Sequence, residues 1–521
     1  MDRSGHHQRG IALCWVVALV GLGSGFWFRL SGLGSKPLWL DEAYSAFAAD
    51  HGLSFIWTIV PRYDVHPPLY YSMLHLWDLA FGDALLARRL LGLLFGMATI
   101  AAAAACAATL AGIAGADRLG RAMITTIVAV LVALQPLMII MTQQVRPYPV
   151  MILVYTIGVL AILRLLAAAG TAGRRWRGWV GVVFIAEALL LWLHALGPFY
   201  AASLSIALAV ALVRLRPGRT EWIAAIIGQV LVGLVYLPAV LILADQAPTW
   251  AHSSWLKFDP AGIGDALSTI YLLPGAAVTV AGLSAMAIGG VVLARRGAMA
   301  AGAALLVLGL LPTALSLVAS LTVAPVFLAR TLSPTTVPML LLMGASLACA
   351  LQWRRIIMAL LLVVLLPFAW SDYRTTRLPP PEDWRGTVAW LSAHIKPGDI
   401  VWAYPNEGAL PLRYAARDLH RDLPVRQIPA DVPALAFPGA HPAGGRGAVS
   451  LSATQIDALM RSDAAQRPPT IWLLGLASEI YDPADLMGYA LGRTRVPIAR
   501  FRRDGIAVVG FARRDRPLPV R

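Results

Sequence analysis

Long apolar runs separated by short polar segments make up the first 371 residues. A helix needs about 17–25 apolar residues to cross a bilayer. Eleven runs approach or reach that length: Ile11–Phe28, Leu90–Ala114, Ala122–Met141, Tyr148–Ala169, Trp179–Leu196, Pro198–Val213, Trp222–Ala244, Ile270–Ala294, Ala298–Val323, Thr335–Leu351 and Ile356–Trp370. The first run is long for the apolar part of a signal peptide, so we expect it to remain as the first helix. The pattern predicts an α-helical, multi-pass membrane protein with about eleven transmembrane helices.

Residues 372–521 have a different pattern, in which short apolar stretches alternate with polar turns. Helical spacing covers Asp383–His394 and Ala453–Arg461, and strand-like stretches cover Ile400–Tyr404 and Thr470–Leu474, with a final hairpin around residues 504–505. We therefore expect a transmembrane domain over residues 1–371 and a soluble C-terminal α/β domain over residues 372–521. The first outer loop, residues 29–89, is expected to carry juxtamembrane helices.

The composition agrees with a membrane protein, because 58% of the residues are hydrophobic and only 14% are charged. The formal net charge is +15, but the basic residues lie in short clusters between the apolar runs. No basic stripe interleaved with aromatic residues is present, which argues against a nucleic-acid partner. Cytoplasmic loops of membrane proteins collect Arg and Lys, and this rule explains the charge more simply.

The short run Pro68–Phe81 decides the topology, because it contains His75 and Asp78 and its crossing would reverse every later loop. If this run lies along the membrane surface, five basic clusters fall on the cytoplasmic side with the N-terminus, as the charge rule requires. These clusters are Arg118/Arg121, Arg174/Arg175/Arg177, Arg214/Arg216/Arg219, Arg295/Arg296 and Arg354/Arg355. Arg88 and Arg89 then remain at the outer face.

With this topology the polar, aromatic and proline-rich loops collect on the outer side of the membrane. They are residues 29–89, 142–149, 194–198, 245–269 and 325–330. Polar groups gathered at one membrane face call for a functional explanation. We therefore expect a site, and the C-terminal domain, on the outer side of the cytoplasmic membrane.

Two adjacent carboxylates, Asp41 and Glu42, follow the first apolar run and are flanked by aromatic residues. Side chains of neighbouring residues on a helix diverge by about 100°. One carboxylate in the site and one in a supporting role is the natural interpretation, and a carboxylate in a desolvated pocket can act as a general base. The structural alternative is that Asp41 caps a helix that starts at Glu42.

Residues 64–71 form a second unusual cluster, in which His66 precedes two prolines and the pair Tyr70 and Tyr71. These three side chains are candidates for substrate contact, and the alternative is a turn with an interfacial aromatic belt. Asp64 and His66 alone have no clear metal-ligand spacing, so no metal site is assigned.

Two arginines, Arg146 and Arg330, are predicted at the outer ends of helices. A guanidinium group can bind a lipid phosphate through paired hydrogen bonds, or it can simply reach the lipid headgroups. Tyr148 and His194 lie in neighbouring outer turns and are further candidates for substrate contact.

These segments together resemble polyprenyl-phosphate-sugar-dependent glycosyltransferases of the GT-C superfamily. The likeness is to the family that includes protein O-mannosyltransferases and the aminoarabinose transferases of lipid A. It is carried, in this order, by residues 40–44, 66–71, 143–149, His194, the segment from Pro325 to Arg330, and residues 382–385. Thr331 departs from the pattern, because many members have tyrosine after the arginine.

The resemblance implies that Asp41 is the catalytic base and that a membrane-embedded donor carries one phosphate. A single sugar would pass, with inversion, to a hydroxyl group of a glycolipid, polysaccharide or protein outside the membrane. The family fixes neither the sugar nor a metal requirement, so a divalent cation stays open and no cofactor is assigned. Two other functions stay open as well: a transporter or flippase of lipid-linked sugars, and a ligase that moves a whole glycan from a lipid diphosphate.

Overall fold

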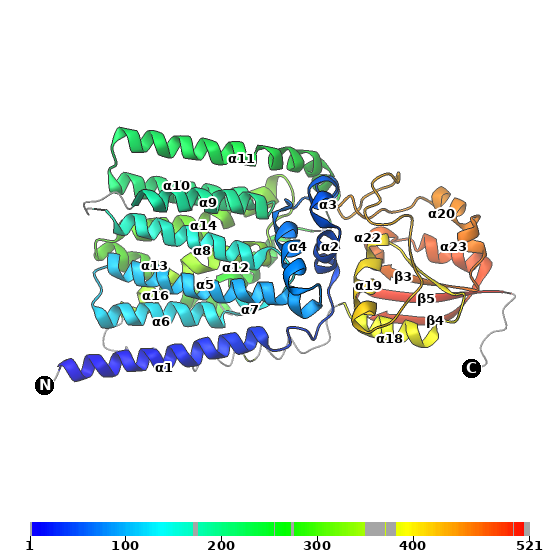
Figure 1. Ribbon diagram of the computed structural model, residues 1–521, viewed down its shortest axis with the longest axis horizontal. Helices are drawn as coiled ribbons and strands as arrows, with labels where there is room; N and C mark the ends of the chain where they lie inside the picture. Colours follow the sequence, from blue (N-terminus) through cyan, green and yellow to red (C-terminus); the bar gives the residue numbers. More distant parts are fainter. Residues whose placement is uncertain are drawn as a thin grey trace. The chain divides into compact units, whose positions relative to one another are not determined.

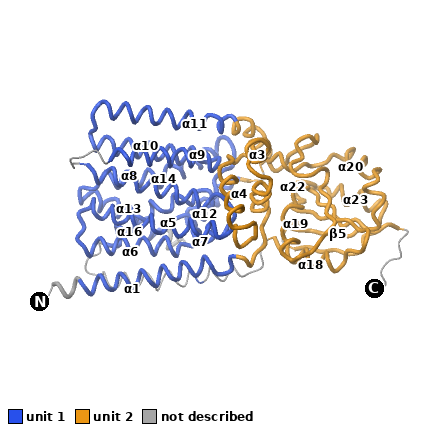
Figure 2. The backbone as a smooth tube through the Cα atoms, viewed as in Figure 1, with its two compact units in different colours: residues 1–33, 89–241, 258–377 blue, residues 34–88, 242–257, 378–521 orange. Residues whose placement is uncertain are grey.

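The computed structural model describes residues 3–169, 176–254, 256–271, 276–349, 370, 382–503 and 505–514. The chain forms two compact units (Figure 2). Unit 1 comprises residues 1–33, 89–241 and 258–377, and unit 2 comprises residues 34–88, 242–257 and 378–521. The first loop therefore belongs to the same compact unit as the C-terminal domain. A single domain boundary near residue 371 does not describe this grouping.

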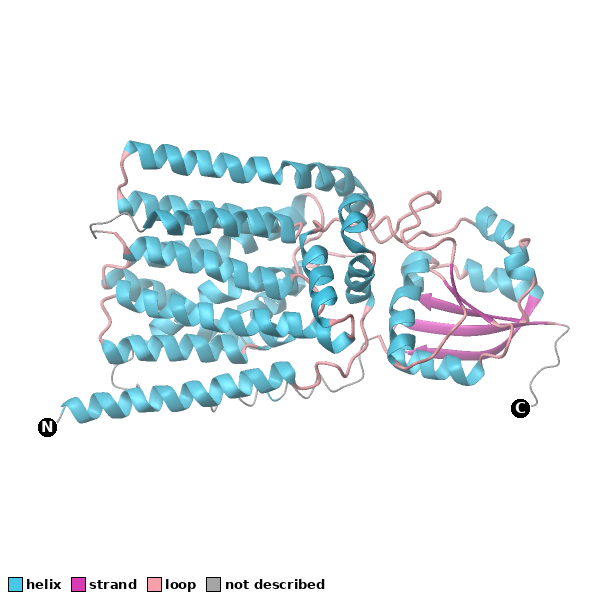
Figure 3. Ribbon diagram, viewed as in Figure 1, coloured by secondary structure: helices cyan, strands magenta, loops and turns pink. Residues whose placement is uncertain are grey.

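Unit 1 consists of helices that run side by side (Figures 1 and 3). They are α1 (Arg3–Leu30), α5 (Leu85–Ile113), α6 (Arg118–Leu134), α7 (Pro136–Thr142), α8 (Tyr148–Ala167), α9 (Trp176–Leu193), α10 (Gly197–Leu215), α11 (Arg219–His252), α12 (Ile263–Tyr271), α13 (Ala276–Arg295), α14 (Met299–Thr322), α15 (Ala329–Leu332) and α16 (Thr336–Cys349). The ends of α5 and α11 extend into unit 2. The short 3-10 turns are η2 (Pro260–Gly262) and η3 (Ser333–Thr335).

Within the described ranges, eight helices are long and apolar enough to cross a membrane, or nine if α6 and α7 form one bent span. Within the described residues, the predicted runs from Ile11–Phe28 to Thr335–Leu351 overlap helices, although the apolar part of α13, Val280–Arg295, is shorter than a span. The eleventh run, Ile356–Trp370, lies outside the described residues apart from its last position. The chain is thus a multi-pass membrane protein.

The run Ala122–Met141 was expected as one helix, but the structure breaks it at Gln135 with a bend of 58°. Pro136 has no backbone N–H and cannot continue the hydrogen-bond ladder. The carbonyls left open at the end of α6 accept hydrogen bonds from the buried Arg29 guanidinium. Its Nη2 donates to Val132 O over 3.1 Å, and its Nη1 donates to Ala133 O.

Small residues bring the helices of unit 1 into close contact. A Cβ atom added at Gly25 of α1 would lie 2.7 Å from the carbonyl oxygen of Ala133 on α6. One added at Gly289 of α13 would lie 1.9 Å from the carbonyl oxygen of Leu342 on α16. These helix pairs therefore pack backbone against backbone, as small residues permit in membranes.

Unit 2 contains the helices of the first loop: α2 (Leu40–Asp50), α3 (Gly52–Thr58), η1 (Val60–Arg62) and α4 (Leu69–Phe81). The run Pro68–Phe81 thus forms α4, a helix of 13 residues. The C-terminal part adds α18 (Trp384–His394), β1 (Ile400–Ala403), η5 (Asn406–Gly408), α19 (Ala409–Asp418), β2 (Val425–Gln427), α20 (Ala453–Met460), α21 (Asp463–Gln466), β3 (Thr470–Leu476), α22 (Ser478–Tyr481), α23 (Leu486–Thr494), β4 (Arg495–Arg503) and β5 (Ile506–Arg513).

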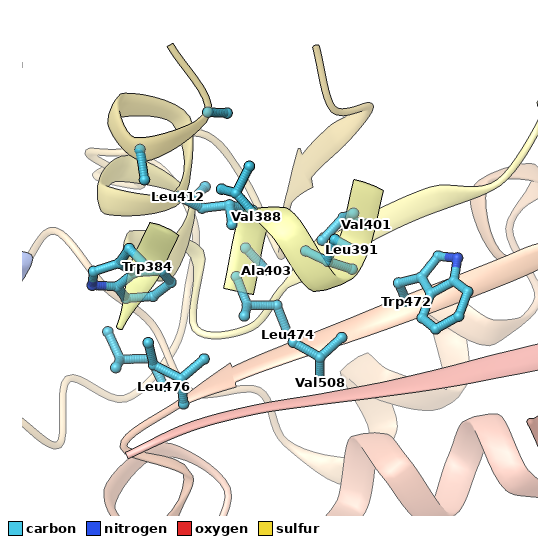
Figure 4. Close-up of a cluster of buried hydrophobic side chains, with 14 residues drawn as sticks. Trp384, Val388, Leu391, Val401, Ala403, Leu412, Trp472, Leu474, Leu476 and Val508 are labelled. Carbon is cyan, nitrogen blue, oxygen red and sulfur yellow. The ribbon is translucent and has the colours of Figure 1, made fainter. Parts of the chain in front are cut away.

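The five strands form one sheet in the order β2-β1-β3-β5-β4. β2, β1 and β3 are parallel, and β5 is antiparallel to both of its neighbours. Successive residues of β1 belong to different apolar clusters, Val401 with α18 and α19 (Figure 4) and Trp402 with α20 and α23. The sheet is therefore covered on both faces, and the predicted α/β domain, its two helices, its strands and its final hairpin are confirmed.

Direct contacts explain why the first loop forms one unit with the C-terminal domain. α2 packs against α19. The backbone N–H of Leu40 donates to Glu382 Oε2 over 3.0 Å, and the Tyr414 hydroxyl donates to Asp50 Oδ2 over 2.6 Å. Contacts between residues more than 340 positions apart thus fix the start and the end of α2.

Candidate active site

The helix that carries the paired carboxylates begins two residues earlier than the capping alternative assumed. α2 starts at Leu40, and Trp39 is the residue at its N-cap position. Asp41 therefore lies inside the first turn and is not the N-cap residue. Glu42 is 1% exposed, and its Oε2 accepts a hydrogen bond from the backbone N–H of Trp39 over 3.4 Å. Glu42 thus supports the start of the helix, and Asp41 is the less buried carboxylate of the pair.

The C-terminal domain brings two further carboxylates to this turn. Glu382 Oε2 accepts hydrogen bonds from the N–H of Leu40, over 3.0 Å, and from the indole N–H of Trp384, over 2.7 Å. Glu407 Oε2 accepts from the Tyr44 hydroxyl over 2.9 Å. Tyr44 lies three residues after Asp41, a spacing that places both on one face of a helix.

Burial raises the pKa of Glu407 to about 7, and the charges of Asp41 and Glu382 act in the same direction. Hydrogen bonds from Tyr481 and Tyr44 act in the opposite direction. Burial likewise raises the pKa of Glu382, with contributions from the charges of Asp41 and Glu42. Glu382 and Glu407 therefore hold a proton more readily than isolated carboxylates would.

The residues 64–71 form a closed polar cluster. Asp64 Oδ1 accepts from the backbone N–H of His66 and lies 2.9 Å from its ring Nδ1, and Asp64 Oδ2 accepts from the Tyr71 hydroxyl over 2.7 Å. Burial alone would raise the pKa of Asp64, but His66 and these hydrogen bonds bring it down to about 2. Tyr70 is 3% exposed and packs edge-to-face on Tyr71. His66 and Tyr71 thus have a definite structural partner in Asp64.

Three of the remaining candidates come together within unit 1. The buried Arg146 guanidinium lies 5.9 Å from the ring centre of Tyr148, and that ring lies 6.0 Å from the His194 ring. The N–H of Leu196 donates to His194 Nδ1 over 3.0 Å, which leaves the ring proton of neutral His194 on Nε2. A cation, an aromatic face and an N–H donor are groups that can bind a sugar phosphate.

Arg330 belongs to the short helix α15 and is half-buried. Its backbone carbonyl accepts from Ser333 Oγ over 2.8 Å, and the hydroxyl of Tyr200 on α10 donates to the carbonyl of Thr331. The turn η3, which follows α15, packs against α8. The backbone around Arg330 is therefore well anchored.

The sequence candidates divide between the two units (Figure 2). Unit 2 holds Asp41, Glu42, His66, Tyr70 and Tyr71, and unit 1 holds Arg146, Tyr148, His194 and Arg330. Sequence reasoning missed Glu407 altogether, because it lies in a turn after a strand with no catalytic motif around it. Glu382 was noted only as part of a resembling segment. No group of three or more His, Cys, Asp or Glu side chains able to hold a metal ion occurs in the described part of the chain.

No protein-family model matches the chain, and no curated protein sequence matches it. Solved structures do match over almost the whole length. ArnT from Cupriavidus metallidurans in the apo state superposes with a TM-score of 0.60 at 13% identity, covering 95% of this chain and 97% of that one. ArnT bound to undecaprenyl phosphate matches with a TM-score of 0.57 at 12% identity, covering 98% of both chains.

The oligosaccharyltransferase of Archaeoglobus fulgidus in complex with Zn and sulfate matches with a TM-score of 0.52 at 10% identity. The match covers 96% of this chain and 74% of that one. At these identities the likeness shows the fold alone. The chain has the GT-C fold, with a C-terminal sheet domain attached to the membrane helices. The structures that share this fold are glycosyltransferases.

Proposed function

We propose that the protein is a membrane glycosyltransferase that moves a single sugar from a polyprenyl-phosphate donor to a hydroxyl group of an acceptor. The observation that carries this proposal is the likeness over 98% of both chains to ArnT bound to undecaprenyl phosphate. The acceptor is a glycolipid, a polysaccharide or a protein on the outer side of the cytoplasmic membrane. The C-terminal domain is proposed to lie on the same side, which the distribution of basic clusters supports.

Asp41 serves as the general base in this proposal. It takes the proton of the acceptor hydroxyl while the oxygen attacks the anomeric carbon and the bond from that carbon to the phosphate oxygen breaks. The products are the glycosylated acceptor, with inverted configuration, and the lipid phosphate. Support comes from the position of Asp41 in the first turn of α2, where Glu42 is occupied by the backbone of Trp39.

Arg146 and Arg330 serve as the groups that neutralise the donor phosphate. Charge that develops on the leaving phosphate is stabilised by fixed cations in a site with little water. Arg146 is buried beside Tyr148, which restricts its orientation. Tyr148 and His194, with His66, Tyr70 and Tyr71, are the proposed sugar and lipid contacts.

A transporter of lipid-linked sugars is the competing function, and Glu187 of α9 is the residue that it would use. The buried Glu187 carboxylate accepts from Ser205 Oγ over 2.8 Å and from Gln229 Nε2 over 3.1 Å. These partners come from α10 and α11. Interhelical hydrogen bonds of this kind hold membrane helices together, which favours a structural role for Glu187.

The test is to incubate purified protein in detergent with undecaprenyl-phosphate sugars and an extract of envelope lipids and polysaccharides. We expect release of undecaprenyl phosphate from at least one donor, and loss of that release in Asp41→Asn. A parallel sample with an undecaprenyl-diphosphate glycan examines the ligase alternative. Transfer from the diphosphate donor alone would replace the proposed donor, and no transfer from any donor would refute the proposed function.

A further inference from the structure

The C-terminal sheet has a topological switch point next to the helix that carries Asp41. The chain leaves β1 through η5 and α19 and pairs as β2 on one side of β1, whereas β3 pairs on the other side. In open α/β sheets, ligands bind outside the carboxyl ends of the strands at such a point. Glu407 follows the carboxyl end of β1, and Tyr481 follows the carboxyl end of β3.

Helix α2 meets the sheet domain at this switch point. The Tyr44 hydroxyl donates to Glu407 Oε2 over 2.9 Å, and the Tyr481 side chain faces the same carboxylate. Glu407 is only 7% exposed. A buried carboxylate that accepts a hydroxyl donor from another element fixes that partner, because losing the bond would leave a charged group poorly satisfied.

We propose that Glu407 is a positioning residue for the sugar transfer, which holds the turn of α2 that carries Asp41 through Tyr44 and keeps a negative charge beside it. This inference rests on the proposed function. A negative charge on Glu407 attracts the proton that leaves the acceptor hydroxyl. The C-terminal domain thereby takes part in the chemistry, although Glu407 itself touches no substrate.

The protonation state of Glu407 decides whether it can act in this way. The titratable groups that face it are Asp41 and Tyr44 from α2, Glu382 from the segment before α18, and Tyr481 from α22. The ionised carboxylate accepts from the Tyr44 hydroxyl and carries the charge, whereas the protonated acid loses the charge and one acceptor position. Because its pKa is raised to about 7, the transfer rate should increase as the pH rises through that value.

The experiment compares kcat and KM of wild type, Glu407→Gln and Glu479→Gln between about pH 5.5 and pH 8.5. The donor is the undecaprenyl-phosphate sugar from which wild type releases most undecaprenyl phosphate. Glu479 is an exposed glutamate of the same domain and provides the matched control. We expect kcat of wild type and of the control to increase with pH around 7. The Glu407→Gln variant should lack this increase and fall about tenfold behind at high pH, with little change in KM.

Tyr44→Phe provides a second variant that leaves the carboxylate in place. Loss of the tyrosine hydrogen bond, which stabilises the ionised form, should move the midpoint of the pH dependence of kcat to higher pH. An unchanged pH profile in Glu407→Gln, or an unchanged midpoint in Tyr44→Phe, overturns the inference while the Asp41 dependence of the reaction stands. If wild type releases no lipid phosphate, the proposed function fails, and if Asp41→Asn is fully active, the proposed role of Asp41 fails. Either result takes the inference with it.

Discussion

Two buried ionisable side chains of unit 1, Arg29 and Glu187, have neutral partners, whereas the carboxylates around Asp41 in unit 2 lie near other carboxylates. In unit 1, Arg29 lies among backbone carbonyls and Glu187 lies between the neutral side chains of Ser205 and Gln229. In unit 2, by contrast, the carboxylates of Glu382 and Glu407 lie close enough to Asp41 to feel its charge. Neutral partners satisfy a buried charge and join helices. Neighbouring like charges repel each other instead, and carboxylates with pKa values shifted in this way are common at functional sites.

The difference indicates two uses of polarity in one chain. The buried ionisable groups of unit 1 that have neutral partners maintain a bundle of apolar helices. In unit 2, Asp41, Glu382 and Glu407 form an acidic cluster, in which the neighbouring charges contribute to the raised pKa of Glu382 and Glu407. Five predictions test this contrast.

The largest expected effect concerns the compartment of unit 2. A topology reporter fused after Arg385 should be active only on the outer side of the cytoplasmic membrane, because this topology places the basic clusters inside. A reporter fused after Arg296 should give the opposite signal. Cytoplasmic activity of the Arg385 fusion would refute the eleven-helix topology and the outer position of the acidic cluster.

Asp41→Asn should lower the transfer rate by on the order of 10²–10⁴-fold, the usual effect of losing a general base. Its thermal stability should change little, because Asp41 is not the N-cap residue of α2. The control is Asp422→Asn, an exposed aspartate of the same unit. Full activity of purified Asp41→Asn would move the base to another carboxylate of the cluster.

Arg146→Ala should raise the donor KM by about 10- to 100-fold, which corresponds to the loss of hydrogen bonds to a charged group. The KM should be measured with the complete polyprenyl-phosphate sugar as donor and at equal expression of the variants. Arg118→Ala, from a predicted cytoplasmic cluster, is the control and should keep the wild-type KM. If both variants behave alike, Arg146 only anchors the helix in the membrane.

Arg29→Leu should reduce the free energy of unfolding by about 1–3 kcal/mol, because Val132 O and Ala133 O lose their donors where α6 breaks. The measurement is thermal unfolding in detergent, with Arg9→Leu as an exposed control. The transfer rate per folded molecule should stay near the wild-type value. If the variant is as stable as wild type but inactive, Arg29 takes part in the reaction, and the purely structural role assigned to it in unit 1 is wrong.

The smallest expected effect is on how the stability of the folded protein depends on pH. The pKa of Glu407 is about 7 in the folded protein, above the ordinary value of 4.5. The folded state therefore binds the extra proton between these values, and stability falls as the pH rises from about 4.5 towards 7. The unfolding temperature of wild type should decrease over this window, and Glu407→Gln should show a smaller decrease. Parallel curves for the two proteins would contradict the raised pKa.

Much of the fold can be read from local patterns. Apolar run length located the membrane helices, and the short apolar run Thr470–Leu474 located the buried strand β3. Pro136 also indicates the break after Gln135, because proline cannot donate to the hydrogen-bond ladder of a helix. The length of the apolar run alone does not reveal this break. Such features depend on neighbours in sequence, and a sequence shows them directly.

The site was only partly predictable, for a physical reason. Asp41, Arg146 and His194 stand out because polar residues at the ends of apolar runs are unusual. Glu407 does not stand out, because its role depends on Tyr44, 363 positions earlier in the chain. No local periodicity specifies a contact between residues so far apart, and only the folded structure brings them together.

The contacts between α2 and the last third of the chain also determine the order in which parts of the protein can assemble during synthesis. Leu40 pairs with Glu382 across 342 positions, so the partner of α2 does not yet exist when α2 leaves the ribosome. At about 5–20 residues per second, that interval lasts tens of seconds. During it, the membrane helices can insert while the acidic cluster is still incomplete. Glu382 and Glu407 can therefore reach Asp41 only as the final domain emerges, after the membrane helices have been synthesised.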